Sequence, residues 1–329
     1  MKPILTFLIY SYNQEDFIRH AVLGALSQTY KPLQIILSDD HSSDNTFNIM
    51  EEMAKDNAVN NNIILHQCPT NLGTRHHLNR AIQLAEGELI ILAAGDDVSV
   101  PERTEKVYEA YLKGGKTGRS ILSDLQFIDK NGQEQAGTYL PLPPYTHERF
   151  LKDKWHAYGA SQAIHKEVFD YFGPLPFGYH EDQVLVHRAL LLGTVEYIPM
   201  KLVKHRRHDS NISITPYHQQ NLNSYKSHEK FGEKDSLMGN TAILSDYITH
   251  HSKSQKRISE TNLTRIFNRI RFASLSIELY NRPITYIPVY CVKCIFYKIP
   301  LSFFYKKVVR LLKVFIKSNP HALPLTTRQ

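Results

Sequence analysis

Four short apolar runs alternate with helical patterns over the first hundred residues. The apolar runs cover residues 4–10, 33–39, 63–67 and 88–94, and helical patterns follow over 14–28, 42–57, about 74–86 and after Pro101. Because the runs are apolar throughout, they are typical of strands that are buried on both faces. This order predicts an α/β fold, with a mostly parallel sheet covered by helices on both faces.

Polar residues follow each of the four predicted strands. Some of them suit helix capping, and we expect Asn13 to cap the first helix and Ser42 or Ser43 the second. The carboxyl ends of parallel strands lie at one edge of a sheet, where open α/β folds bind ligands. The residues concerned are Ser11, Tyr12 and Asn13; Asp39 to Asp44; Asn71, Leu72 and Gly73; and Gly95, Asp96 and Asp97. We therefore expect a ligand crevice at this edge.

The fourth strand ends in two adjacent carboxylates, Asp96 and Asp97. Neighbouring carboxylates repel each other unless positive charge holds them. The chain has neither the glycine fingerprint of dinucleotide-binding folds nor a phosphate-binding loop with its lysine, so a bound diphosphate needs another source of neutralisation. Carboxylates that hold a hard divalent cation supply it.

The same segments resemble a known family. The stretches IYSYNQEDFIRHAVLGALSQTYKPLQIILSDDHSSDNT and NLGTRHHLNRAIQLAEGELIILAAGDD are similar to the first blocks of the family 2 glycosyltransferases, and the resemblance covers about residues 3–215. It implies the GT-A (Rossmann-like) fold, a nucleotide-diphosphate sugar donor that is usually bound with Mn²⁺ or Mg²⁺, and inversion at the anomeric carbon.

The resemblance also implies roles for individual residues. Tyr12 and Asn13 would line the nucleotide pocket, Asp40 would accept a hydrogen bond from the base, usually uracil, and Asn71 and Gly73 would close over the nucleoside. Asp96 and Asp97 match the acidic metal motif, whose commoner form has a further Asp where this chain has Ala94. Which of the two holds the metal and which contacts the ribose is open.

The second half of the chain supplies the expected base. Glu181 and Asp182 match the family's acidic pair at the start of a helix, and Asp182 is the expected catalytic base, with Glu181 as the alternative. Such a base removes the proton of the acceptor hydroxyl as the sugar carbon is attacked. An acidic pair also suits any helix start, because it interacts favourably with the helix dipole. Arg188 is expected to support the fold or to contact phosphate.

The segment VKHRRHDSNIS, residues 203–213, resembles the family's last motif. It implies that His208 ligates the metal or contacts the diphosphate, and that Arg206 or Arg207 offsets phosphate charge. The histidine pairs His76–His77 and His250–His251 are expected at the surface.

The charge distribution and the cysteine content limit which other classes of function the chain can have. After Glu278 the chain has nine Lys and Arg and no Asp or Glu, so the net charge of +7 belongs to this tail and argues against a nucleic-acid surface on the main domain. Three cysteines are no disulfide framework, and the pair Cys291 and Cys294 has no second pair of zinc ligands. No signal peptide and no transmembrane helix are expected.

We expect three segments: a GT-A domain over 1–215, a polar linker or cover over 216–260, and a basic amphipathic helical extension over 261–329. On a helix over 302–317, one stripe is basic and the opposite face is apolar, which is typical of an anchor at an anionic membrane surface. The alternative is a helix docked on the protein or on a partner.

The sequence thus predicts a metal-dependent inverting glycosyltransferase on the inner face of the cell membrane. Its donor would be a UDP-sugar and its acceptor a hydroxyl of a glycan or lipid-linked glycan. The alternatives are a sugar nucleotidyltransferase and a non-catalytic nucleotide-sugar-binding subunit of a membrane assembly.

Overall fold

The computed structural model describes residues 2–57, 61–137, 143–152, 159–175, 181–208, 211, 222–254, 259–282, 286–296 and 308–309. The chain divides into two compact units, Met1–Asn211 and Ile212–Gln329. Each is described by itself below.

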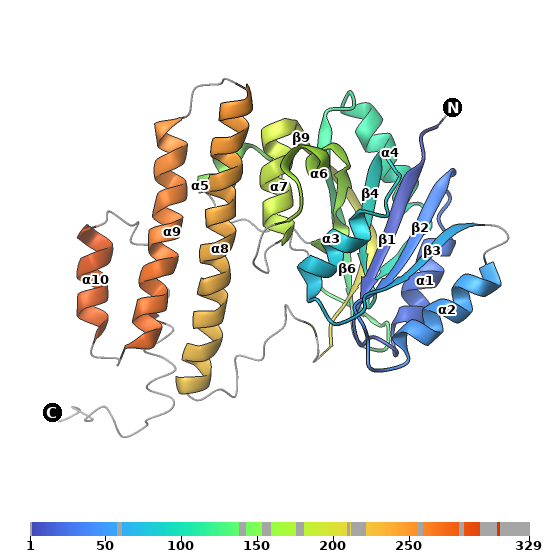
Figure 1. Ribbon diagram of the computed structural model, residues 1–329, viewed down its shortest axis with the longest axis horizontal. Coiled ribbons are helices and arrows are strands. Elements are labelled where there is room, and N and C mark those ends of the chain that lie inside the picture. The colour runs from blue at the N-terminus through green and yellow to red at the C-terminus, as the bar shows by residue number, and fades with distance from the viewer. Residues whose placement is uncertain are drawn as a thin grey trace. The chain divides into compact units, whose positions relative to one another are not determined.

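The first unit is an α/β domain whose sheet begins with four parallel strands (Figure 1). In the described residues the sheet order is β3-β2-β1-β4-β8-β6-β9-β5, with β7 on β6. β8 is antiparallel to β4 and β6, β9 is parallel to β6, and β5 is antiparallel to β9. The strands are β1 Leu5–Ser11, β2 Leu33–Asp39, β3 Asn62–Gln67, β4 Leu89–Ala94, β5 Val98–Ser99, β6 Gly118–Ile128, β7 Glu134–Gln135, β8 Ala163–His165 and β9 Thr194–Arg206. The parallel half is as predicted, and the antiparallel strands extend it.

Helices cover both faces of this sheet, as predicted. Phe7 and Ile9 on β1 pack in one core with residues of α1, α2 and α4, while α3 contacts β1 and β2 without joining that core. The helices of this unit are α1 Ile18–Leu26, α2 Thr46–Asn57, α3 Thr74–Ile82, α4 Arg103–Lys113, α5 His147–Lys152, α6 Glu167–Phe172 and α7 Glu181–Leu192, with a short 3-10 helix at Gly159–Ser161. Alternate residues of a buried strand face opposite sides, so the continuous apolar runs serve both layers.

The second unit is helical in its described residues, with α8 Leu222–Ser254, α9 Glu260–Asn281 and α10 Ile287–Phe296. A polar linker or cover is predicted over 216–260, whereas residues 222–254 form the long helix α8, which packs against α9. The buried positions of α8 follow helical spacing but include Glu233, Asn240 and His250 beside Ile243 and Tyr247, so the apolar periodicity is weak.

The C-terminal part has its own small core. Tyr290 and Cys294 on α10 pack with Phe272 and Leu279 on α9, and Val308 packs against this cluster. Most of the predicted amphipathic helix over 302–317 lies outside the described residues. Within the part of the chain that is described, no helix is both long enough and apolar enough to cross a bilayer.

Candidate functional site

The four parallel strands end together. Their register sets Ser11 beside Asp39, Asp39 beside Gln67, and Tyr10 beside Ala94. The loops that follow these strands therefore begin at one edge of the sheet, which is the edge where the sequence predicts a ligand crevice.

The loops after β1 and β2 are joined by reciprocal hydrogen bonds. The backbone N–H of Asn13 donates to Ser42 Oγ at 2.9 Å, and Asn13 Oδ1 accepts from the backbone N–H of Ser43 at 2.8 Å. Further on, the N–H of Glu15 donates to Asp44 Oδ2, and Glu15 Oε2 accepts from the N–H of Asn45. These two loops form one hydrogen-bonded unit.

This arrangement corrects the predicted caps. Asn13 has a φ of 51° and its side chain bonds the neighbouring loop, while α1 begins later, at Ile18. Asn tolerates this left-handed backbone better than most residues, because its short polar side chain bonds locally. At α2 the donor groups of Thr46 bond Asp44 Oδ1, so Asp44 acts at this helix start and not Ser42 or Ser43.

Asp40 holds the loop after β3. Its carboxylate is 2% exposed and accepts from the backbone N–H groups of Leu72 and Gly73, both at 2.8 Å. Asn71 Oδ1 accepts from the same Gly73 N–H at 3.0 Å, and Gly73 has a φ of 77°. The structure thus brings Asp40, Asn71 and Gly73 together. Tyr12, at 46% exposure, leaves its ring largely open to solvent.

Asp96 and Asp97 differ in their surroundings although they are adjacent. Both carboxylate oxygens of Asp97 lie within 3.1 Å of His205 Nδ1, and Oδ1 also accepts from the backbone N–H of Arg206 at 2.9 Å. Burial raises the pKa of Asp97, whereas the bonded carboxylate raises the pKa of His205 against its own burial. Asp97 is therefore occupied in fixing the end of β9.

Asp96 faces a different pair. Its Oδ2 lies 3.0 Å from His208 Nε2 and 3.1 Å from Asn211 Nδ2, and these two nitrogens are 3.2 Å apart. The Phe17 ring packs on the His208 ring with centroids 4.6 Å apart. The sequence leaves the roles of Asp96 and Asp97 open, and the contacts distinguish the two residues.

Arg206 is not available for phosphate, which corrects one expectation. It is 3% exposed, its Nε donates to the backbone oxygen of Asp96, and its terminal nitrogen donates to the carbonyls of Asp129 and Lys130. Arg207 lies over the Phe127 ring. Arg188 donates to the carbonyls of Gly173 and Pro174, in keeping with the expected support of the fold.

Glu181 and Asp182 begin α7 and are half-buried. Asp182 Oδ1 accepts from the backbone N–H of Gln183 at 2.7 Å, and its Cβ lies close to Gly159. The Tyr10 hydroxyl lies near enough to this pair and to Asp96 and Asp97 for their charges to act on it. Its pKa is raised by burial first, then by the charges of Glu181, Asp97, Asp96 and Asp182. The charges of all four predicted carboxylates thus act on one hydroxyl.

Sequence reasoning missed several residues that shape this site. Tyr10 directly precedes the polar residues Ser11, Tyr12 and Asn13, and the sequence indicates only a buried strand position for it. Arg103 is fully buried, donates to Ser99 Oγ and to the Leu92 carbonyl, and bears a charge that acts on Asp97. Asn211 lies inside the quoted VKHRRHDSNIS segment, and its position three residues after His208 was a usable signal.

Two of the histidines expected at the surface are buried. His77 is 1% exposed and its Nε2 lies 2.7 Å from Ser38 Oγ, and His250 is 7% exposed on α8. Both lie on helix faces that pack inward, which a pair of adjacent histidines does not reveal.

The donor set around Asp96 suits a divalent cation. One carboxylate oxygen and one imidazole nitrogen lie 3.0 Å apart, which is the spacing of neighbouring ligands around an ion bound at about 2.1 Å. Oxygen with imidazole is a set that Mn²⁺ accepts. Asp96 and His208 are only two ligands, so oxygens of the donor or of solvent would have to complete the coordination of a metal there. In the described residues, the group of three His, Cys, Asp or Glu side chains that lies closely enough together to hold a metal is His66, Cys68 and His77.

Comparisons with known proteins agree with this geometry. Residues 6–172 match the family described as Glycosyl transferase family 2. An uncharacterized glycosyltransferase of Haemophilus influenzae is 24% identical over 281 residues, which is 77% of this chain and 83% of that protein. The Escherichia coli protein named UDP-Glc:alpha-D-GlcNAc-diphosphoundecaprenol beta-1,3-glucosyltransferase WfaP is 34% identical over 120 residues, 33% of this chain and 45% of that one.

Among solved structures, Staphylococcus aureus TarS 1–349 in complex with UDP-GlcNAc superposes with a TM-score of 0.56 at 15% identity, covering 96% of this chain and 90% of that chain. At this identity the likeness concerns the fold, which is the GT-A arrangement. With the family match over just more than half of its length and the strand-end site in place, the chain belongs to glycosyl transferase family 2 and is a glycosyltransferase enzyme.

Proposed function

We propose that this glycosyltransferase transfers a sugar, with inversion, from a UDP-sugar to a hydroxyl of a glycan or lipid-linked glycan. The observation that carries the proposal is that two acidic pairs, Asp96 with Asp97 and Glu181 with Asp182, both lie near enough to Tyr10 for their charges to raise the pKa of its hydroxyl. One pair serves the diphosphate and the other the acceptor. TarS binds UDP-GlcNAc in its complex and WfaP is named for UDP-Glc, and both relatives favour uridine in the donor.

In this proposal, the loops after β1, β2 and β3 bind the nucleoside end of the donor. Asp40, already bonded to the loop that carries Asn71 and Gly73, retains lone pairs on both oxygens for a uracil N–H. Tyr12 offers an exposed ring for stacking. Asn13 accepts a hydrogen bond from the backbone N–H of Ser43 and so holds together the two loops that would contact the base.

We assign Asp96 and His208 as the protein ligands of Mn²⁺ or Mg²⁺. When bound there, the cation neutralises the diphosphate and stabilises UDP as a leaving group. Asp97 is a supporting residue in this proposal, because His205 and the Arg206 N–H occupy its oxygens.

Asp182 is the proposed base. It accepts the proton of the acceptor hydroxyl as that oxygen bonds to the anomeric carbon, and the bond to UDP breaks on the opposite face. The proton moves from the acceptor oxygen to the Asp182 carboxylate and later to water. Glu181 is the alternative base at the same helix start.

The test compares Asp182→Asn with Glu181→Gln in full-length protein. If Asp182 is the base, its variant loses at least about 100-fold in kcat, the scale of general-base catalysis, while the Kd for UDP stays within about twofold. The Glu181→Gln variant keeps most activity. The reverse pattern assigns the base to Glu181, and two fully active variants overturn the assignment of a base to this pair.

Donor and metal are tested together by thermal shift with UDP, UDP-sugars and GDP-sugars, with and without Mn²⁺. A ligand at about 100 times its Kd stabilises the fold by about 2.7 kcal/mol. We expect stabilisation by UDP that needs the metal and is absent in Asp96→Ala. Binding without any release of UDP from UDP-sugars would instead indicate a non-catalytic subunit.

We also propose that the basic tail holds the enzyme on the cytoplasmic face of the cell membrane, where a lipid-linked acceptor lies. Each Lys or Arg near an anionic surface adds about 1 kcal/mol. Because α10 forms a core with α9, the test replaces Lys306, Lys307, Arg310, Lys313 and Lys317 by Gln instead of truncating the chain. Loss of sedimentation with phosphatidylglycerol vesicles is expected, and unchanged sedimentation contradicts the anchor.

A further inference from the structure

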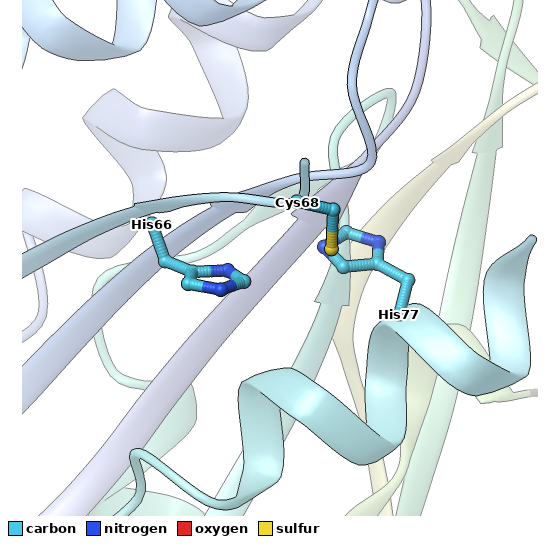
Figure 2. A group of neighbouring side chains, drawn as sticks. All are labelled: His66, Cys68 and His77. Atoms are coloured by element: carbon cyan, nitrogen blue, oxygen red, sulfur yellow. The ribbon is translucent and has the colours of Figure 1, made fainter. Parts of the chain in front are cut away.

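Three potential metal ligands meet beside the loop after β3, and one of them, His77, belongs to a histidine pair that the sequence places at the surface. His66 is on β3, Cys68 follows that strand, and His77 is on α3. Figure 2 shows the two imidazole rings and the thiol turned toward one another, from the strand end on one side and the helix on the other. One ligand atom from each lies within 4.8 Å of the other two.

The two histidines already share a partner. Ser38 Oγ lies 2.9 Å from His66 Nδ1 and 2.7 Å from His77 Nε2. A hydroxyl donates only one proton, so it donates to one ring and accepts from the other. Burial lowers the pKa of both imidazoles, that of His77 to about 4. The neutral imidazole is the form that binds metals.

The local charge favours a cation. The carboxylates of Asp39 and Asp40 both act on His77 and on Cys68, whereas Arg80, one turn further along α3, opposes them at His66 and Cys68. Cys68 and His77 are buried, and His66 is half-buried. Burial, and then the Asp40 carboxylate, raise the pKa of the Cys68 thiol to about 11. A cysteine gives up its proton when it binds a metal as the thiolate.

We propose that His66, Cys68 and His77 form a second metal site, for a borderline or soft cation of the Zn²⁺ class. Two imidazoles and one thiolate select such cations over Mn²⁺ and Mg²⁺, which prefer oxygen. Bond lengths of about 2.0–2.3 Å place tetrahedral ligands about 3.3–3.8 Å apart, so atoms that lie within 4.8 Å of one another have to approach by at most about 1.5 Å on binding. Ser38 Oγ or water fills the fourth position.

The site has a structural consequence for the donor pocket. Cys68 and His77 lie on either side of the loop that carries Asn71 and Gly73, and this loop is bonded to Asp40. A bound cation ties both ends of the loop to β3 and α3. The cation therefore acts as a clip for the nucleoside-binding loop, separate from the cation at Asp96 and His208.

The test uses Co²⁺ as a spectroscopic substitute in full-length, chelator-treated protein. A thiolate ligand gives an intense near-ultraviolet charge-transfer band, which oxygen and imidazole ligands at Asp96 and His208 do not give. We expect this band in the wild type, its loss in Cys68→Ser, and its retention in a Cys291→Ser, Cys294→Ser double variant, which removes the other two thiols. A band that survives Cys68→Ser but disappears in the double variant overturns the proposal.

A matched pair of neighbouring histidines completes the test. Zn²⁺ affinity, measured by competition with a chromophoric chelator, is expected to fall at least about tenfold in His77→Gln and to stay unchanged in His76→Gln, whose side chain is exposed. His66→Asn, at a half-buried position, provides a second variant if His77→Gln does not fold. Equal affinity in wild type, His66→Asn and Cys68→Ser also overturns the site.

Discussion

At the scale of single residues, adjacent carboxylates take different parts because their partners come from a distant strand. Asp97 is bonded by His205 and by the Arg206 N–H, 108 and 109 positions away. Asp96 meets His208 and Asn211 just beyond that strand. The end of β9 therefore decides which carboxylate is structural and which one can face a ligand.

The two aspartates are expected to differ in stability when each is replaced by Ala in metal-free protein. Asp97→Ala leaves two buried donors without their acceptor and should lower the free energy of unfolding by about 2–3 kcal/mol. Asp96→Ala should cost less, because the Asp96 side chain is 10% exposed against 3% for Asp97, so its two former donors are more easily hydrated. Urea unfolding measures both, and a larger loss in Asp96→Ala contradicts the assigned roles.

Sequence reasoning at this scale succeeded where position along a strand determines the answer. The alternation of strands and helices places Asp40, Asn71, Gly73, Asp96 and Asp97 at strand ends, and the parallel register brings those ends to one edge. It failed where a distant partner decides. Nothing near Asn13 shows that it bonds Ser43, and nothing near His77 shows that Ser38 lies beneath it.

At the scale of elements, close backbone packing limits which positions accept a side chain. A Cβ on Gly87, just before β4, would lie 2.3 Å from the backbone nitrogen of Thr6 on β1. A Cβ on Gly239, within α8, meets nothing within 4 Å. The first glycine is therefore required by close packing, and the second is not.

Gly87→Ala is expected to destabilise the first unit by about 3 kcal/mol or more, because β1 or β4 has to move. Gly239→Ala is the matched control and should stabilise α8 by about 0.5–1 kcal/mol, since Ala has the better helix propensity. Thermal unfolding followed by circular dichroism measures both. Similar melting temperatures for the two variants would show that the contact between β1 and Gly87 is not limiting.

One ion pair joins α9 to α10 and gives a pH-dependent contribution. Glu278 accepts from Lys293 at 2.8 Å and from the Tyr286 hydroxyl at 2.6 Å, and these bonds lower the pKa of Glu278. A lowered carboxyl pKa stabilises the fold above the unfolded value of 4.5, and this stabilisation is lost as the pH falls through the folded value.

Glu278→Gln is therefore expected to be less stable than the wild type near neutral pH and equal to it in acid. The difference should be small and should shrink in high salt, because both side chains are partly exposed. Urea midpoints across the acid range measure it, with Glu51→Gln, from the exposed pair Glu51–Lys55, as the control. A difference that persists unchanged in acid would assign the effect to packing.

At the scale of the whole molecule, the site belongs to one of the two units. All the strand-end residues, the α7 carboxylates and the His66–Cys68–His77 group lie within Met1–Asn211. The helical unit was harder to predict, because α8 buries polar residues such as Asn240 and His250 along the same face as Tyr247. Its polar composition suggests a linker, whereas its contacts with α9 make it a structural helix.

Hydrogen exchange should report this division. UDP with Mn²⁺ is expected to slow exchange in the loops after β1, β2, β3 and β4 and at the start of α7, because ligand binding suppresses local opening there. The peptides of α8, α9 and α10 should exchange at unchanged rates. Equal protection in both units would place part of the donor site in the helical unit.

The hydrogen-bonded loops after β1 and β2 also limit how donor preference can be engineered. Asn13 and Glu15 each give and receive a bond across the gap, to Ser42 and Ser43 in one case and to Asp44 and Asn45 in the other. If one of the two loops is replaced by the corresponding loop of a relative, the loop that remains loses its hydrogen-bond partners. The two segments, about 11–15 and 41–46, have to be exchanged as a single cassette of fixed length, and libraries that insert or delete residues in only one of them should be depleted of active clones.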